Sequence, residues 1–450
     1  MAIYKHSSSA VFTRFFDPVL SLYAYSDRQY DCPEFTDLDF LEMGILRCLS
    51  DSRTGRDFLQ RHGDHGRKEI PVDLFFKGLK SNRRLENARS INAMLAALMT
   101  GRCQDPFAAI AELDDFWLYA GDGHYHAAAA HDPKSESSSG ENKKRATGHF
   151  FMLNLRTHHL GHLTLAEQGG VRKGEHDMHA IKRVESDALR GGAPKGRKVI
   201  IAWDRAGIDF AHWNRLKRCA GLYFISREKE NMRLIKCGER PIDRSDERNA
   251  GVIADENAGP GSGGAMLRRI TYIDPLENTR YTFITTEMTL PPGILVLIYK
   301  QRWDIEKVFD ELKSKLAEKK SWASNRAAKS AHAQFLCVAH NLMVLIEEQI
   351  RRQEGTCLPT GRPVCRQAGR QRAGSRAQRK AQRGGRRKRR ELHRHRAPTL
   401  HGAQSEIHPL VEELRLSRGS LGRSARPPQG NLRLFLIKVF HTVALSTTTG

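Results

Sequence analysis

The sequence predicts a mixed α/β protein with a helical N-terminal region. Three observations support this prediction. Residues 1–110 carry apolar side chains near helical spacing. Residues 196–204, GRKVIIAWD, form a compact apolar run between a glycine and an acid, which is typical of a buried central strand. Strand-like segments fill residues 222–286 and precede a long helical pattern at about 295–316.

The N-terminal region is expected to contain at least two long helices. The first spans Leu38–Leu59, and the second covers residues 72–99, directly after Pro71. Arg83 and Arg84 lie in the middle of the second helix.

The centre of the chain alternates between strand and helix patterns. Residues 116–123, FWLYAGDG, predict a strand that ends in a turn, and residues 131–147 predict a polar loop. A glycine-rich loop is expected at Asn257–Gly264. Further strands are expected at 148–157 and 160–167, and helices at 176–189, 207–218 and 327–350.

The chain has a net charge of +23, which favours a polyanionic partner. Residues 351–400 hold 17 Lys and Arg against two acids, so this segment alone carries +15. It has almost no large apolar residues and cannot form a core. Two interpretations of the tail are open: a basic nucleic-acid-binding segment, or the product of a shifted reading frame.

Several classes of protein are disfavoured. The longest apolar run, Ile294–Tyr299, is far shorter than the roughly 18 to 20 residues that span a membrane, and the N-terminus resembles no secretion signal. The eight cysteines form no C-x-x-C pair, which argues against a zinc site or a disulfide framework. The H-x-x-H pair, His176 and His179, is poor evidence for a metal site. A cytoplasmic protein is expected.

The most informative segment is YKQRWDIEKVFDELK, residues 299–313. Tyr299, Arg302, Glu306 and Lys313 fall within roughly 60° of one another on a continuous helix, next to its apolar face. Such a face would present one carboxylate to a metal ion and two cations to phosphates. The alternative is a solvated face on which Arg302 and Glu306 form an i,i+4 ion pair.

These positions give the pattern Y-x2-R-x3-E-x6-K, which resembles the signature of bacterial insertion-sequence DDE transposases of the insertion sequence four family. Trp303 follows the arginine, as in several relatives. The resemblance covers about residues 70–345. It implies a ribonuclease-H-like mixed sheet with flanking helices, a β-rich insertion before the catalytic helix, and a helical N-terminal domain. It also implies two aspartates at strand ends upstream of Glu306.

Two aspartates fit this expectation. Asp122 follows the apolar strand FWLYAG, and Asp204 follows KVIIAW. Asp122 can also be explained as the first residue of a D-G hairpin turn, and Asp204 as the N-cap of the next helix. Together with Glu306 they would form a triad that binds two divalent cations, Mg²⁺ or Mn²⁺, since both ions prefer oxygen ligands.

The resemblance implies two-metal cleavage of DNA followed by strand transfer, with a hairpin formed at the transposon end. Tyr299, Arg302 and Lys313 would hold phosphates near the scissile bond. Arg83 and Arg84 are expected to bind the transposon end. The expected partners are double-stranded terminal inverted repeats and target DNA, bound by a homodimer in a nucleoid-associated synaptic complex.

Two alternative functions are open: an inactivated remnant that binds DNA without cutting, and another nuclease with the same ribonuclease-H-like core. The abnormal tail favours the first, and the complete Tyr-Arg-Glu-Lys pattern disfavours the second. The expected organisation is a helical DNA-end-binding region at 1–110, a catalytic core at 111–221 and 287–350, a β-rich insertion at 222–286, and an Arg-rich tail at 351–450.

Overall fold

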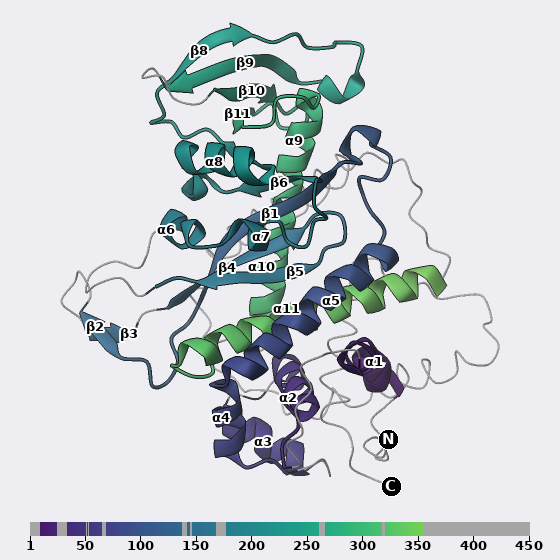
Figure 1. Ribbon diagram of the computed structural model, residues 1–450, viewed down its shortest axis with the longest axis vertical. Helices are drawn as coiled ribbons and strands as arrows, with labels where there is room; N and C mark the ends of the chain where they lie inside the picture. Colours follow the sequence, from purple (N-terminus) through teal and green to yellow (C-terminus); the bar gives the residue numbers. More distant parts are fainter. Residues whose placement is uncertain are drawn as a thin grey trace, which may run out of the picture. The chain divides into compact units, whose positions relative to one another are not determined.

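A computed structural model provides the fold (Figure 1). None of the described helices is both long and apolar enough to cross a bilayer. The expected tail beyond residue 353, together with His176, lies outside the described residues. The structure describes residues 10–24, 34–50, 52, 54–64, 69–136, 142–144, 146–167, 177–260, 266–316 and 320–353.

The described part of the chain is built around a nine-stranded mixed sheet in the order β5-β4-β1-β6-β7-β11-β10-β9-β8. In its first five strands β4 runs antiparallel to both β1 and β5, whereas β1, β6 and β7 are parallel to one another. This order and these directions are those of the ribonuclease H fold, so the predicted fold class is confirmed. The five strands are β1 (Phe116–His126), β4 (Thr147–Asn154), β5 (Leu160–Leu165), β6 (Lys198–Trp203) and β7 (Leu222–Arg227).

The β-rich segment that precedes the helices at residues 292–315 continues the same sheet in antiparallel fashion, because β11 pairs with β7. The expected loop at Asn257–Gly264 is wrong in part, since residues 257–260 complete β9 and pair with β8 and β10. The segment expected as the insertion, 222–286, begins with β7, which pairs with β6 as the fifth strand of the ribonuclease-H-like part of the sheet. The domain boundaries themselves stay a prediction. The outer strands are β8 (Leu234–Glu239), β9 (Val252–Pro260), β10 (Leu267–Ile273) and β11 (Arg280–Thr285), and a separate ribbon pairs β2 (Lys134–Glu136) with β3 (Asn142–Lys144).

One face of the sheet is covered by short helices and a buried aromatic core. Trp203 of β6, Trp213 of α8 and Phe224 of β7 pack together, with ring centroids 5.4–5.7 Å apart. The Trp213 indole also donates a hydrogen bond to the carbonyl of Gly207 (2.9 Å), which satisfies its buried N–H. The elements involved are α6 (Asp177–Lys182), α7 (Ser186–Leu189), η2 (Arg205–Gly207) and α8 (Phe210–Ala220).

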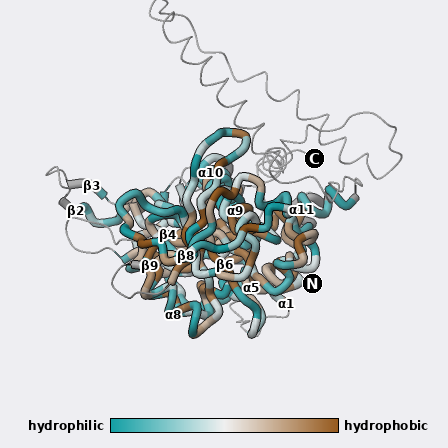
Figure 2. Tube along the Cα trace, turned by 90° about the horizontal axis from the view of Figure 1, so that it is seen from above, coloured by the Kyte–Doolittle hydropathy of each residue, from teal (hydrophilic) through white to brown (hydrophobic). Residues whose placement is uncertain are grey.

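Long helices belong to the other side of the fold, where α5 and α11 lie side by side (Figure 1). A buried polar contact joins both to the edge of the sheet: the amide of Asn341 donates to Asn92 (2.8 Å) and to the carbonyl of Leu160 (3.0 Å). Hydrophobic segments lie mostly within the body of the trace (Figure 2). The bounds are α1 (Ala10–Ala24), α2 (Asp37–Leu49), α3 (Gly55–Asp64), α4 (Val72–Leu79), α5 (Asn82–Arg102), η1 (Ala111–Leu113) and α11 (Arg326–Gln353).

Three of the expected long helices are interrupted. The one predicted at 72–99 consists of α4 and α5, which are separated at Lys80 and Ser81, so Arg83 and Arg84 lie in the first turn of α5 and not in the middle of a helix. The one predicted at Leu38–Leu59 ends at Ser50, and Thr54 starts a new helix by accepting the amide of Asp57 (3.0 Å). The third, predicted at about 295–316, consists of α9 (Pro292–Gln301) and α10 (Trp303–Lys315).

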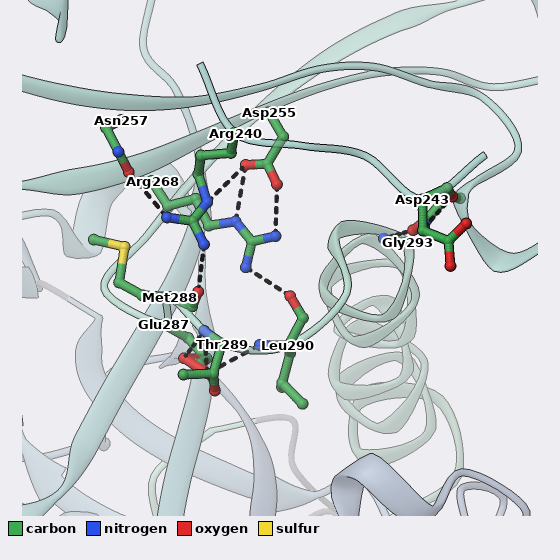
Figure 3. A network of polar contacts seen from close by, with 11 residues as sticks. Arg240, Asp243, Asp255, Asn257, Arg268, Glu287, Met288, Thr289, Leu290 and Gly293 are labelled. Atoms are coloured by element: carbon green, nitrogen blue, oxygen red, sulfur yellow. Dashed lines mark hydrogen bonds and ion pairs between the residues drawn. The ribbon is translucent and has the colours of Figure 1, made fainter. Parts of the chain in front are cut away.

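A buried ion-pair network fixes the segment that leads into α9 (Figure 3). Arg268 of β10 binds both carboxylate oxygens of Asp255 on β9, at 2.9 and 2.7 Å, and donates to the carbonyl of Leu290 (2.7 Å). Arg240 donates to the carbonyl of Met288 (2.6 Å). The β-rich segment thereby holds the start of α9, and through it the helices that carry the candidate site.

Candidate active site

Asp122 and Asp204 are brought together by strand register. Gly121 of β1 pairs with Trp203 of β6, so the next residue on each parallel strand is one of the two aspartates. Neighbouring strands lie about 4.8 Å apart, and residues in register on parallel strands point to the same face. A Cβ on Gly121 would come within 2.5 Å of the Trp203 ring, so glycine gives the indole room beneath the strand.

The D-G turn proposed for Asp122 is wrong. The strand β1 continues to His126, and Asp122 pairs with Phe151 of β4. Asp122 lies instead one residue past the last pair between β1 and β6, where the two central strands part. Asp204 directly follows β6, and its exposed side chain caps the short helix η2 by accepting the amide of Arg205. The N-cap interpretation is correct only for η2, because the helix expected at 207–218 begins at Phe210 and is capped by Asp209.

Asp122 is a partly buried carboxyl whose surroundings shift its pKa. Its side chain is 21% exposed and accepts the amide of Gly123 (2.8 Å). Burial raises its pKa to about 6; the guanidinium of Arg302 opposes this rise, and the negative charges of Asp204 and Glu306 add to it. The pKa of one acid is therefore sensitive to the charges of the other two.

Glu306, on α10, is linked to Asp122 through Arg302. The guanidinium of Arg302 donates to Glu306 (2.6 Å) and contacts Asp122 (3.4 Å), and it also lies over the ring of Tyr299, 5.6 Å from its centroid. Burial raises the pKa of the Tyr299 phenol, and the negative charge of Asp204 adds to the effect. Tyr299, Arg302 and Glu306 therefore form one group around the aspartates.

Arg302 lies at the junction of α9 and α10 and is outside both helices. Its amide donates to the carbonyl of Tyr299 and its carbonyl accepts the amide of Ile305, both at 3.1 Å, so the chain tightens to i,i+3 bonding here. The predicted single helix face is wrong in this respect.

The other predicted residues lie elsewhere. Lys313 is exposed, and in the part of the chain that the structure describes no hydrogen bond or ion pair joins it to the three acids. Arg84 is buried and bonds to the buried Asp37 (3.2 Å) and to the carbonyl of Phe35 (2.5 Å). Arg83, 39% exposed, also pairs with Asp37.

The sequence interpretation missed one basic residue at this edge of the sheet, Arg227. Ala202 of β6 pairs with Ile225 of β7, which places Arg227 in register with Asp204. Its guanidinium lies over the ring of Tyr281, 4.8 Å from the centroid, and its charge lowers the pKa of Tyr299. The signal was available: Arg227 ends the next parallel strand, LYFISR, just as Asp204 follows β6.

The donor chemistry of the three acids fits Mg²⁺ or Mn²⁺, since all their ligand atoms would be carboxylate oxygens. Among the described residues, however, no three acidic, histidine or cysteine side chains are gathered tightly enough to hold a metal ion. Arg302 keeps two of the acids apart, because its guanidinium lies between Asp122 and Glu306. A cationic position thus exists at the site, and a side chain of the protein fills it.

The sheet is ribonuclease-H-like, with acids at the ends of two central strands and on a following helix, and this is the arrangement of the ribonuclease-H-like DDE fold. A family match agrees with this fold. Residues 126–342 match the family described as "Transposase DDE domain", a match that includes Asp204 and Glu306 and begins four residues after Asp122.

A sequence comparison with curated proteins gave no match. Among solved structures, the chain is similar to the piggyBac transposase in a synaptic complex with hairpin DNA, determined by cryo-EM. The two are 12% identical, the alignment covers 82% of this chain and 86% of that one, and the TM-score is 0.35.

Proposed function

We propose that this protein is a transposase that cuts DNA at the ends of an insertion sequence and joins them to target DNA, with Asp122, Asp204 and Glu306 as its catalytic acids. The observation that carries the proposal is the convergence of these acids. Strand register sets Asp122 beside Asp204, and Arg302 joins Asp122 to Glu306. The family match over residues 126–342 supports the class of reaction.

The three carboxylates would hold two divalent cations, which when bound activate a water or a DNA 3′-hydroxyl and stabilise the leaving 3′ oxygen. The chain's own cations would position the DNA. Arg302 and Arg227 lie beside the acids, and each can donate paired hydrogen bonds to a phosphate. The Tyr299 hydroxyl is a further donor, and the exposed Lys313 would contact the backbone farther along α10.

The proposed partners are duplex DNA, both the terminal inverted repeats and the target, and a second copy of the chain in the synaptic complex. Of the two arginines expected to bind the transposon end, Arg83 is the better candidate, because its side chain is partly exposed. Arg84 is buried against Asp37 and Phe35, so its contribution would be to position α5 beside α2.

The test uses the full chain and duplex DNA taken from the flanks of its gene, incubated with Mg²⁺ and analysed for nicking and strand transfer. Wild type is expected to cut, and EDTA to abolish cutting. Asp204→Asn and Glu306→Gln should each lower the cleavage rate on the order of a thousandfold, since a metal-binding carboxylate contributes several kcal/mol. DNA binding should persist in both variants.

Asp310→Asn is the matched control, because Asp310 is an exposed carboxylate on the same helix, α10. It should cut at the wild-type rate. Binding without cutting by wild type would identify an inactivated remnant. Cutting without strand transfer of the 3′ end would identify another nuclease, and equal activity in all four proteins would remove these acids from the mechanism.

A further inference from the structure

The two oxygens that would ligate a cation between Asp122 and Glu306 are already bound to a cation of the chain. Arg302 donates from Nη2 to Oε1 of Glu306 (2.6 Å) and contacts Oδ2 of Asp122 through Nη1 (3.4 Å). The three side chains are only 10–30% exposed, so water screens this arrangement weakly.

Arg302 and a divalent ion cannot share this position. Both need the same carboxylate lone pairs, and a doubly charged ion beside a largely buried guanidinium would be repelled by it. The site therefore has two states: one in which Arg302 neutralises the acids, and one in which it has moved and the ion takes its place. Without another ligand, the guanidinium competes with the metal.

The position of Arg302 makes the exchange feasible. It lies at the junction of two helices, outside the α-helical hydrogen bonding of either. Within the described part of the chain, its buried Nε has no hydrogen-bond acceptor. The state in which Arg302 neutralises the acids therefore leaves one donor of the guanidinium unsatisfied. A phosphate oxygen would satisfy that donor and offer a bidentate contact in exchange for the carboxylates.

We propose that Arg302 is an exchangeable counter-ion, which blocks the divalent-cation site of the DNA-free protein and is drawn away from Asp122 and Glu306 by a DNA phosphate. This inference rests on the proposed function, and it adds regulation to the same site. DNA and metal then bind cooperatively, and the coupling is reciprocal: DNA tightens metal binding, and the metal tightens DNA binding. A protein without DNA would hold little metal and would cut nothing.

The test measures Mn²⁺ binding to the full chain by calorimetry and by the electron paramagnetic resonance signal of free Mn²⁺, with and without duplex DNA from the flanks of the gene. Wild type is expected to bind Mn²⁺ at least tenfold more tightly with DNA. Arg302→Gln, which removes the charge, should bind Mn²⁺ at least tenfold more tightly than wild type in the absence of DNA and should gain less from its addition.

Lys307→Gln is the matched control, since Lys307 is a cation on α10 that pairs with Asp304 and touches neither Asp122 nor Glu306. It should behave as wild type. Arg302→Lys retains a cation that cannot bridge two carboxylates in the same fork geometry, and should fall between wild type and Arg302→Gln. Thermal unfolding of each variant shows whether it is folded.

Two outcomes would overturn the inference: equal or weaker Mn²⁺ binding by folded Arg302→Gln without DNA, or no effect of DNA on Mn²⁺ binding by wild type. Failure of the proposed function looks different. If Asp204→Asn and Glu306→Gln bind Mn²⁺ as tightly as wild type in every condition, the acids are not the metal site. If they lose Mn²⁺ while Arg302→Gln gains nothing, only the exchange is refuted.

Discussion

A buried histidine cluster makes the stability of this fold sensitive to acid. Its members are His126 on β1, His149 on β4, His162 on β5 and His332 on α11. The rings of His126 and His149 stack with centroids 3.9 Å apart, His332 lies 5.3 Å from His126, and a nitrogen of His149 lies 3.2 Å from one of His162. Four elements of the core therefore meet on side chains that would carry charge if protonated.

Burial lowers the pKa of His126, His149 and His332 well below the usual value, and it lowers the pKa of His162 to about 3. The neighbouring cations add to the effect: Arg47 acts on His332 in this way. Arg89 and Arg326 lower the pKa of His162 further.

The direction in which stability changes with pH follows from the difference in proton binding between the folded and unfolded chains. The unfolded chain binds protons at these rings below about pH 6.5, whereas the folded chain does not, so stability is lost as the pH falls from about 6.5 toward the depressed folded-state values. Between pH 7.5 and 5.5 each of these rings costs about 1.4 kcal/mol of stability, and the four rings together cost about 5.5 kcal/mol. A domain is stable by about 5 to 15 kcal/mol, so this loss is large.

The assay is urea unfolding of the full chain at pH 7.5 and 5.5, with His332→Phe as the test variant. Phenylalanine can keep the stacking on Trp322, whose ring lies 4.2 Å from that of His332, while one titrating group is removed. The loss of stability in acid should shrink by about 1.4 kcal/mol. His131→Gln, at an exposed position, should leave it unchanged. An identical loss in wild type and His332→Phe would refute the reasoning.

Three further predictions concern single contacts. Gly293→Ala should destabilise the chain by more than about 1 kcal/mol in urea unfolding, because its Cβ would meet the carbonyl oxygen of Arg248 at 1.9 Å. Lys329→Met should cost about 3 to 5 kcal/mol, since it leaves the buried carboxylate of Asp132, 2.9 Å away, without its cation; adding Asp132→Asn should recover part of the loss in the same assay. Arg227→Ala should lower the slope of log affinity for duplex DNA against log salt concentration by about 0.9, as expected for one lost phosphate contact, with unfolding unchanged.

The sequence predicted the strands well where the pattern was local. Alternating or continuous apolar runs identified β1, β4, β5, β6 and β7, and the acid after β6 was recognised from the strand end itself. The extent of β1 was missed because the D-G pair is a strong turn signal on its own. Pairing with β4 over Asp122–His126 overrides that signal, and such pairing depends on residues 21 to 29 positions away.

The partners of the candidate site were harder to predict for the same reason. The contact between Arg302 and Asp122 joins residues 180 positions apart, and only the folded chain brings them together. The histidine cluster also draws its members from three strands and a distant helix, so no spacing along the chain indicates it. Sequence patterns identify which residue types lie at strand ends and on helix faces, whereas the choice of partner is made by tertiary packing.

The packing of Arg302 against β1 changes what its contact with Glu306 does. On a solvated helix face, an arginine and a glutamate four residues apart would form an ordinary surface ion pair, worth a few tenths of a kcal/mol. Here the Arg302 guanidinium lies largely buried and reaches across to Asp122 on β1 as well. The same residue types at the same spacing thus acquire a different electrostatic role, because tertiary packing brings a second acid within reach of the arginine.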